Sequence, residues 1–207
     1  MKIISYVVRR DYGFAPNPFF EYCTLATCKP DIRKSASVGD WIVGTSSIST
    51  GSLNKLVFAM KVTEKLTFNE YWYDERFMNK RPILNQSRKF QYGDNIYHKE
   101  GIEWLQLPSH HSEEDGSFNY KNIATDTKTD NVLISSHFYY FGGNGVSIPS
   151  ELLGIVKKGP SCKYVDNRLH DYFLNNFINK FPLGLNGSPF AWTKLHQERN
   201  LQLLLSF

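Results

Sequence analysis

The sequence predicts an α+β fold in a single domain, 1-207, with a curled mixed β-sheet or small β-barrel and a few flanking helices. Three observations indicate this class. Strand-like segments follow one another early in the chain, an internal helix has a readable start, and the part from about residue 165 shows helical periodicity. No linker is long enough to separate two domains, and 207 residues can bury a core without disulfides.

Four strands are expected before the internal helix. Three of them are short and rich in apolar or β-branched residues, and the fourth alternates between apolar and polar positions, as a half-exposed strand does. The expected ranges are 2–8, 22–27, 40–44 and 56–66.

The internal helix begins at a capping box, in which Thr67 caps the helix and Glu70 reaches back, and it must end before Pro82. A polar stretch rich in turn residues then runs to residue 129, and 109–117 within it is expected to be a solvated loop.

Regular structure returns in the last third of the chain. Strands are expected over 131–141 and 152–156. Asp166 can cap a helix whose apolar positions recur every four residues, and Ser188 followed by proline can open a last helix. The apolar positions of the first of these helices are Leu169, Phe173, Phe177 and Phe181.

Composition and charge restrict the protein class only broadly. Lys and Arg number 24 against 20 Asp and Glu, and this excess of +4 suits a phosphate-bearing partner without indicating a dedicated basic groove. No apolar run approaches the ~20 residues of a membrane span, and the N-terminus lacks the pattern of a secretory signal. We therefore expect a soluble cytoplasmic protein with reduced thiols. The three cysteines fit neither a disulfide framework nor a zinc pattern, and neither a cofactor nor a metal is expected.

The richest functional segment is 9–20, which joins the first two strands. Arg9 and Arg10 offer planar donors for phosphate or a base edge, Asp11 could act as an acid or base, and Asn17 can read a base with donor and acceptor together. The alternative is an ordinary turn held by an Arg–Asp pair.

A second segment, 23–34, carries cations and a cysteine. Lys29 and Arg33 would bind phosphate, and a thiol beside such cations can become a nucleophile, which makes Cys28 the candidate for nucleophilic catalysis. The alternative, which the residues favour, is a small buried apolar cysteine.

Aromatic residues offer stacking platforms in two other places. Trp41 follows a turn at Gly39, and Tyr139 alternates with other aromatic residues in 135–143. His137 in that strand could be a general base, although a lone histidine is more often structural. For Trp41 too, core packing is the stronger alternative.

Other chemistry has little support in the sequence. His110 and His111 stand beside acidic residues, but neighbouring residues in a mobile loop make a poor metal site. The chain contains no G-x-G-x-x-G, Walker, H-E-x-x-H or G-x-S-x-G motif, so P-loop hydrolysis and hydride transfer on a Rossmann fold are disfavoured.

Four stretches taken together, 6–18, 24–33, 38–42 and 132–142, resemble the second nucleotide-modification-associated domain family of bacteria and phages. The resemblance covers the chain from Met1 to about Val156. It implies a setting of modified DNA bases and no established reaction. The fold can be compared, by analogy, with small PUA-like β-barrel modules that bind bases.

Three hypotheses follow for function. The leading one is a binding module that recognises a modified nucleobase, as a free nucleotide or in DNA, within a DNA-modification or phage-defence system. The second is an enzyme that transforms or removes such a base, and the third is a non-catalytic subunit that binds a partner protein from the same operon. The binding hypothesis assumes that the end of the first strand, the bend after Lys29 and the tyrosine-rich strand converge on one surface.

Overall fold

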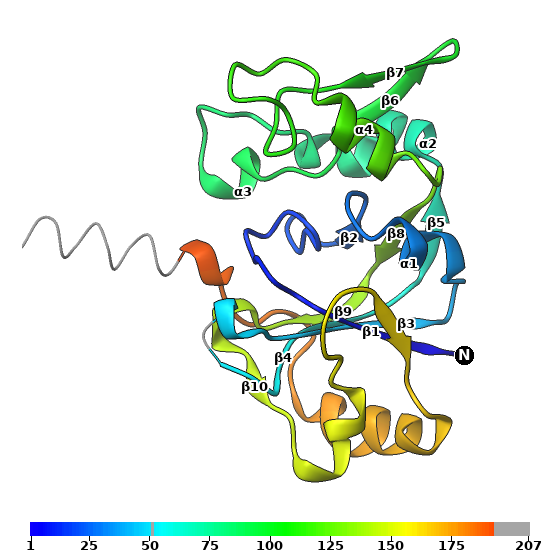
Figure 1. Cartoon of the computed structure of the whole chain (residues 1–207), viewed down its shortest axis with the longest axis vertical. Helices are drawn as coiled ribbons and strands as arrows, with labels where there is room; N and C mark the ends of the chain where they lie inside the picture. The colour runs from blue at the N-terminus through cyan, green and yellow to red at the C-terminus, as the bar shows by residue number, and fades with distance from the viewer. Residues whose placement is uncertain (51, 193–207) are drawn as a thin grey trace, which may run out of the picture. The chain divides into compact units, whose positions relative to one another are not determined.

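The computed structural model describes residues 1–50 and 52–192, and Figure 1 shows the chain coloured from its N-terminus to its C-terminus. The fold is α+β, as the sequence predicts, with a seven-stranded mixed sheet, a three-stranded sheet and a two-stranded hairpin. The chain divides into two compact units. The first unit comprises Met1, Gly13–Trp41 and Met60–Phe138, and the second comprises Lys2–Tyr12, Ile42–Ala59 and the chain from Tyr139 onward. The single domain 1-207 stays a prediction.

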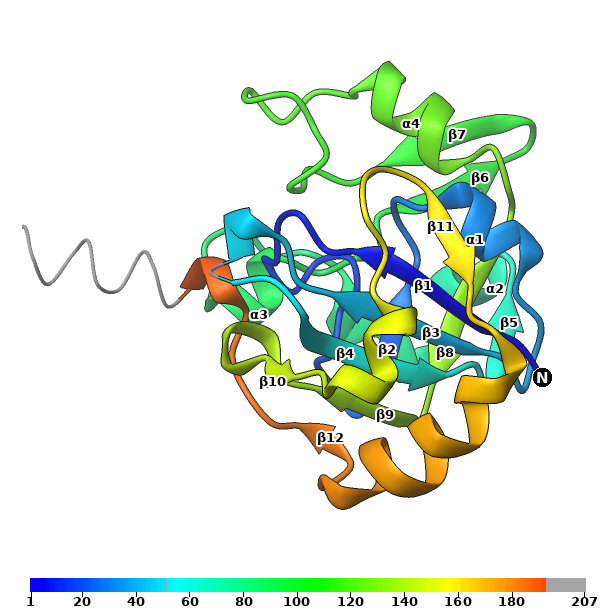
Figure 2. The same ribbon diagram turned by 60° about the horizontal axis from the view of Figure 1, so that its bottom comes forward.

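The seven-stranded sheet forms the framework of the second unit. Its strand order is β11-β1-β3-β4-β9-β12, with β10 paired to β4 (Figure 2). The pairs β1–β11 and β4–β10 are antiparallel and β9–β12 is parallel. Since β11 and β12 are free edges, the described residues form an open mixed sheet and no closed barrel. The strands are β1 Ile3–Val7, β3 Trp41–Thr45, β4 Lys55–Lys61, β9 His137–Tyr140, β10 Val146–Ser147, β11 Cys162–Tyr164 and β12 Gly184–Leu185.

Burial explains the apolar run at the start of the chain. Ile3 and Ile4 are adjacent in β1, so their side chains point to opposite faces of the sheet, and both are fully buried. The ring of Tyr6 meets that of Phe58 in β4 edge to face, with centroids 5.9 Å apart. The central strands of the sheet are therefore covered on both faces.

Short helices complete the second unit. The expected strand over 152–156 is wrong, because residues 152–155 belong to a 3-10 helix that Val156 ends. The expected C-terminal helix is an irregular succession of 3-10 and π-helical turns. Phe173 and Phe177 of the predicted apolar stripe are buried, and Asp166 caps the segment as expected. The predicted last helix begins within 190–192, and its remainder lies outside the described residues. The bounds are η1 Ile48–Thr50, η3 Gly142–Asn144, η4 Ser150–Ile155, η5 Asn167–Leu169, η6 Tyr172–Phe177 and η7 Ile178–Lys180.

The first unit contains the two smaller sheets. In the three-stranded sheet, β8 lies between β2 and β5 and is antiparallel to both, and β6 and β7 form the hairpin. The strands are β2 Cys23–Leu25, β5 Glu64–Leu66, β6 Tyr97–Glu100, β7 Glu103–Gln106 and β8 Val132–Ser135. The helices are α1 Pro30–Ser35, α2 Phe68–Tyr73, η2 Glu75–Lys80, α3 Arg88–Gln91 and α4 Tyr120–Asp126.

The predicted capping box is confirmed at the start of α2. The Thr67 hydroxyl accepts the amide of Glu70 at 3.1 Å, and the Glu70 carboxylate accepts the amide of Thr67 at 2.7 Å. These reciprocal bonds satisfy amides that the first helical turn leaves without partners. They also hold the pKa of Glu70 below its ordinary value.

Two predicted long strands are each divided between sheets. Residues 56–66 form β4 and β5, and 131–141 form β8 and β9. At the second break, the Ser135 hydroxyl accepts the amide of His137 at 3.1 Å and donates to its carbonyl at 2.8 Å. A serine side chain that bonds its own backbone neighbourhood competes with ladder pairing, which accounts for the break at Ser136.

Candidate active site

Cys28 lies in the turn between β2 and α1, at a backbone position of the left-handed region. Its φ is 57° and that of Lys29 is 43°, values that residues other than glycine seldom adopt. Both backbone groups of Cys28 are held: its amide donates to Asp126 Oδ1 at 2.7 Å, and its carbonyl accepts Arg33 Nε at 2.8 Å. A strained turn between a strand and a helix also presents the nucleophile in α/β-hydrolases. This turn therefore fixes a half-exposed thiol in a defined place.

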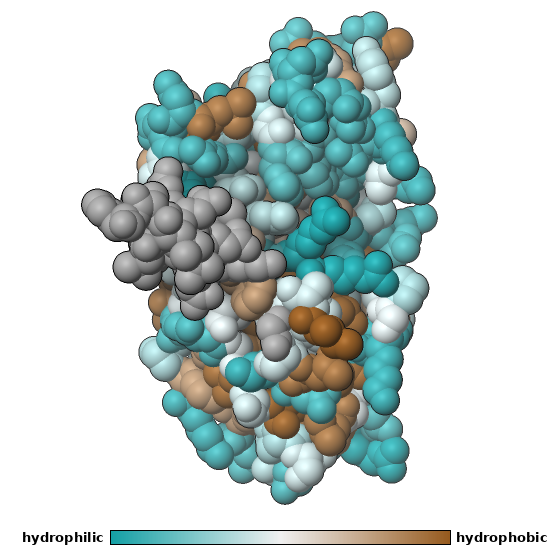
Figure 3. All heavy atoms as spheres, turned by 60° about the vertical axis from the view of Figure 1, so that its left-hand side comes forward, coloured by the Kyte–Doolittle hydropathy of each residue, from teal (hydrophilic) through white to brown (hydrophobic). Residues whose placement is uncertain are grey.

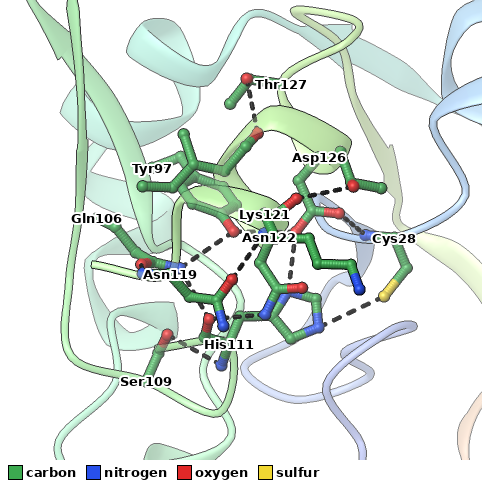
Figure 4. Close-up of polar contacts among 12 residues, drawn as sticks. Cys28, Tyr97, Gln106, Ser109, His111, Asn119, Lys121, Asn122, Asp126 and Thr127 are labelled. Atoms are coloured by element: carbon green, nitrogen blue, oxygen red, sulfur yellow. Dashed lines mark hydrogen bonds and ion pairs between the residues drawn. The ribbon is translucent and has the colours of Figure 1, made fainter. Parts of the chain in front are cut away.

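The thiol of Cys28 meets a histidine that is itself oriented by a carboxylate (Figure 4). Sγ lies 3.6 Å from Nε2 of His111, and the other ring nitrogen, Nδ1, lies 2.8 Å from Oδ2 of Asp126. Thiol, imidazole and carboxylate thus follow one another in a relay. This is the order in which a nucleophile, its base and an orienting group stand in triad enzymes.

Asp126, the last residue of α4, is the fixed end of the relay. Its side chain is only 2% exposed. Besides His111 and the amide of Cys28, it accepts the hydroxyl of Tyr97 at 3.0 Å. Burial raises the pKa of Tyr97 well above its ordinary value, and the charge of Asp126 raises it further, so this hydroxyl remains a donor.

His111 belongs to the loop 109–117, yet it is held on two sides. Its carbonyl accepts Gln106 Nε2 at 3.1 Å and Asn122 Nδ2 at 2.8 Å. The ring of Phe14 lies against the imidazole, with centroids 4.6 Å apart. The expected solvated loop is correct for the exposed residues 113–115, but His111 is half-buried and positioned.

The surroundings of His111 favour its protonated form. Burial alone lowers the pKa of an imidazole, but the hydrogen bond to Asp126 and the contact with Cys28 outweigh burial and raise the pKa of His111 to about 9. A histidine that holds a proton this firmly, with its Nε2 facing sulfur, can take the proton of the thiol and stabilise the thiolate.

Arg33 supports the relay through the backbone of its members. The side chain is fully buried, and its guanidinium donates to the carbonyls of Cys28, Asp126 and, at 2.7 Å, Asn131. Burial lowers the pKa of Arg33, and the charge of Asp126 opposes that shift. Arg33 therefore ties the Cys28 turn to the end of α4, and these donors are engaged with the chain rather than with a phosphate.

The same three side chains include atoms that could ligate a metal, all within 4.8 Å of one another. Their orientation fits a metal poorly, because the sulfur faces Nε2 whereas the carboxylate faces Nδ1 on the other side of the ring. A cation between Sγ and Nε2 would have two ligands from this cluster, and structural or catalytic zinc needs three or four.

The predicted site residues of the second unit differ in their burial. Arg9 and Arg10 are exposed. Asp11 is buried and accepts the Tyr140 hydroxyl at 2.5 Å and the amide of Phe190 at 3.0 Å. Tyr139 is buried, with its hydroxyl 3.3 Å from Asn179 Oδ1.

The other predicted site residues of the first unit range from buried to half-exposed. Asn17 is fully buried, and its Oδ1 accepts the ammonium of Lys80 at 2.7 Å. Trp41 is buried, and its ring meets that of His137 edge to face at 5.4 Å, whereas Lys29 is half-exposed. Burial lowers the pKa of His137, and Lys61 adds to this. The expected convergence of these residues with those of the second unit stays a prediction.

Sequence reasoning identified Cys28 but missed both of its partners. The sequence presents His111 only as part of a poor metal site, and it leaves the polar segment 126–131 open between lining a site and forming an ordinary turn. His111 and Asp126 stand 83 and 98 positions from Cys28, and no local motif joins them. The signal that was available is the pair of histidines in an otherwise polar loop.

Fold and site together define an α+β protein with a cysteine–histidine–aspartate centre. The chain belongs to the nucleotide modification associated domain 2 family, whose sequence model matches residues 1–196. The predicted resemblance is thereby confirmed and extends beyond Val156. No curated protein and no solved structure was found to match the chain. Within the described part of the chain, no helix has the length and apolar character needed to cross a membrane.

Proposed function

We propose that this protein is an enzyme of nucleotide modification that attacks a carbonyl carbon of an acyl group carried by a modified base or nucleotide. Cys28 is the nucleophile, His111 the general base and acid, and Asp126 the orienting carboxylate. The relay Sγ–Nε2, Nδ1–Oδ2 is the observation that carries the proposal. The family supplies the nucleotide setting.

The relay accounts for each proton in such a reaction. Nε2 of His111 holds the proton that the thiol gives up, and sulfur bonds to the carbonyl carbon. The imidazolium then gives this proton to the departing nitrogen or oxygen, whose bond to the carbonyl carbon breaks, and a thioester remains on Cys28. Water attacks the thioester with His111 as base, which releases the acid and restores the thiol.

The test is incubation with nucleotides that carry amide- or ester-linked acyl groups, followed by mass spectrometry of both nucleotide and intact protein. We expect loss of the acyl group and a hydroxylamine-sensitive mass gain on Cys28. Cys28→Ser should abolish turnover, whereas Cys162→Ser, at another half-exposed cysteine, should leave it unchanged. Turnover that survives Cys28→Ser would overturn the proposal.

The leading hypothesis from the sequence, recognition of a modified nucleobase without chemistry, is the competing proposal. It predicts that modified nucleotides raise the melting temperature and that no product forms after long incubation with any acylated nucleotide. A role in phage defence, a cytoplasmic location and a partner protein from the same operon stay predictions.

A further inference from the structure

A cavity in the second unit has the size of a small-molecule site. Its volume is about 600 Å³, within the range of roughly 300–1,000 Å³ that is typical of ligand pockets. It is lined by the end of β1 with Arg9, by 46–49 and 53–54 around η1, and by 156–159. The residues that line it all belong to the second unit, whereas Cys28 belongs to the first.

Aliphatic side chains form one part of the walls of this cavity. Val7 and Val156 contribute to them, together with Ile48 and Leu53. Ile48 is 80% exposed and Leu53 is 57% exposed, which is high for large apolar side chains. Figure 3 looks towards the side that carries η1 and shows hydrophobic side chains gathered there next to hydrophilic ones. Covering such a surface with an apolar or planar group removes it from water, which favours binding.

The charge around the cavity has one sign. Arg9, Lys157 and Lys158 are among the lining residues, and none of the described lining residues is acidic. Three cations without a carboxylate favour an anionic ligand, and Arg and Lys donors suit phosphate oxygens. These walls therefore match a molecule that combines an anionic group with an apolar or planar body.

Hydrogen bonds hold the wall at η1 in place. The Ser49 hydroxyl donates to the carbonyl of Arg9 at 2.7 Å, and the Ser47 hydroxyl donates to the carbonyl of Val8 at 3.2 Å. Thr50 closes the turn, because its hydroxyl accepts the amide of Ser47 at 2.8 Å. The wall and the backbone of Arg9 are thus joined before any ligand arrives, which lowers the entropic cost of binding.

We propose that this cavity binds a nucleoside monophosphate, with its base against Ile48 and Leu53 and its phosphate at Arg9, Lys157 and Lys158. The Asn54 amide supplies a donor and an acceptor for the edge of a base or for a sugar, and the oxygens of Ser47 and Ser49 can accept a further hydrogen bond. A fatty acyl phosphate would satisfy the cations but would desolvate the Asn54 amide without offering it a partner. The proposal shares the nucleotide setting with the proposed function but does not depend on chemistry at Cys28.

Calorimetric titration of the full chain with the four deoxynucleoside monophosphates tests this, against the matched nucleosides, inorganic phosphate and a fatty acyl phosphate. We expect at least one monophosphate to bind about tenfold or more tightly than its nucleoside, since each charge-assisted contact contributes on the order of one tenfold step. Equal affinity for nucleoside and monophosphate, or preference for inorganic phosphate or the acyl phosphate, would overturn the proposal.

Variants at exposed positions locate the site. Arg9→Ser and Ile48→Asp should each weaken binding about tenfold, whereas Lys180→Ser, at an exposed lysine outside the cavity, should leave it unchanged. Cys28→Ser should also leave binding unchanged, so failure of the proposed reaction and failure of this site are distinguishable. Loss of binding in Cys28→Ser, or equal losses in Arg9→Ser and Lys180→Ser, would place the ligand elsewhere and refute the inference.

Discussion

Replacing Asp126 by asparagine removes the charge of the buried carboxylate while nearly keeping its shape. The asparagine has one acceptor oxygen, whereas three donors point at the carboxylate: the ring of His111, the hydroxyl of Tyr97 and the amide of Cys28. Without the carboxylate, only the contact with Cys28 opposes burial, and the pKa of His111 should fall from about 9 towards the ordinary 6.5. A fall of about two pKa units corresponds to ~3 kcal/mol between the two protonation states.

Two measurements check this prediction. An NMR titration of the imidazole resonances, assigned with His111→Gln, gives the pKa in wild type and in Asp126→Asn. Because the folded pKa of about 9 lies above the ordinary 6.5, the His111 interaction stabilises the fold fully below pH 6.5 and is lost as the pH rises through 9. The free energy of unfolding should therefore decline over this range more steeply in wild type than in Asp126→Asn. An unchanged pKa near 9 in the variant would refute the assigned role of the carboxylate.

Three further substitutions test the supporting structure. Tyr97→Phe removes one hydrogen bond to the site carboxylate and should lower the free energy of unfolding by about 1 kcal/mol in urea titrations, with little change in turnover; a loss of activity would contradict the supporting role. Lys80→Met should cost at least about 3 kcal/mol in the same assay, because the buried carbonyl oxygens of Asn17 lose their ammonium partner; a neutral result would show that the ammonium is dispensable. Gly44→Ala places a Cβ 2.2 Å from the ring of Phe58 and should cost about 1–3 kcal/mol by thermal unfolding, whereas an unchanged melting temperature would mean that the ring moves freely.

Features that depend on a few neighbouring residues were predicted correctly from the sequence. The capping box at Thr67 and the apolar run of β1 reappear in the structure because each depends on local hydrogen bonds or on burial of every position. The extent of the strands could not be predicted in the same way. Alternation continues through Val62 and Thr63, but the amide of Val62 bonds Asp40 whereas that of Thr63 bonds Ile134. Partners distant in sequence therefore decide where β4 ends and β5 begins.

The candidate active site could be predicted only in part, for the same reason. Cys28 was identifiable because thiols are few and cations follow it in the sequence. His111 reaches it because Gln106, at the end of the β6–β7 hairpin, and Asn122, in α4, hold its carbonyl. No periodicity or spacing in a single sequence encodes such a long-range arrangement. Arg33 was also singled out from the sequence, but as a ligand for phosphate. In the structure its buried guanidinium donates to backbone carbonyls instead.

The reactivity of Cys28 compared with that of Cys162 tests the central claim most directly. Both thiols are half-exposed, and Cys23 is buried, so one protein contains its own controls. Peptide mass spectrometry after timed alkylation at neutral pH should show Cys28 reacting at least about tenfold faster than Cys162, and His111→Gln should remove this advantage. Equal rates at the two cysteines, unaffected by His111→Gln, would contradict the existence of an activated nucleophile in this protein.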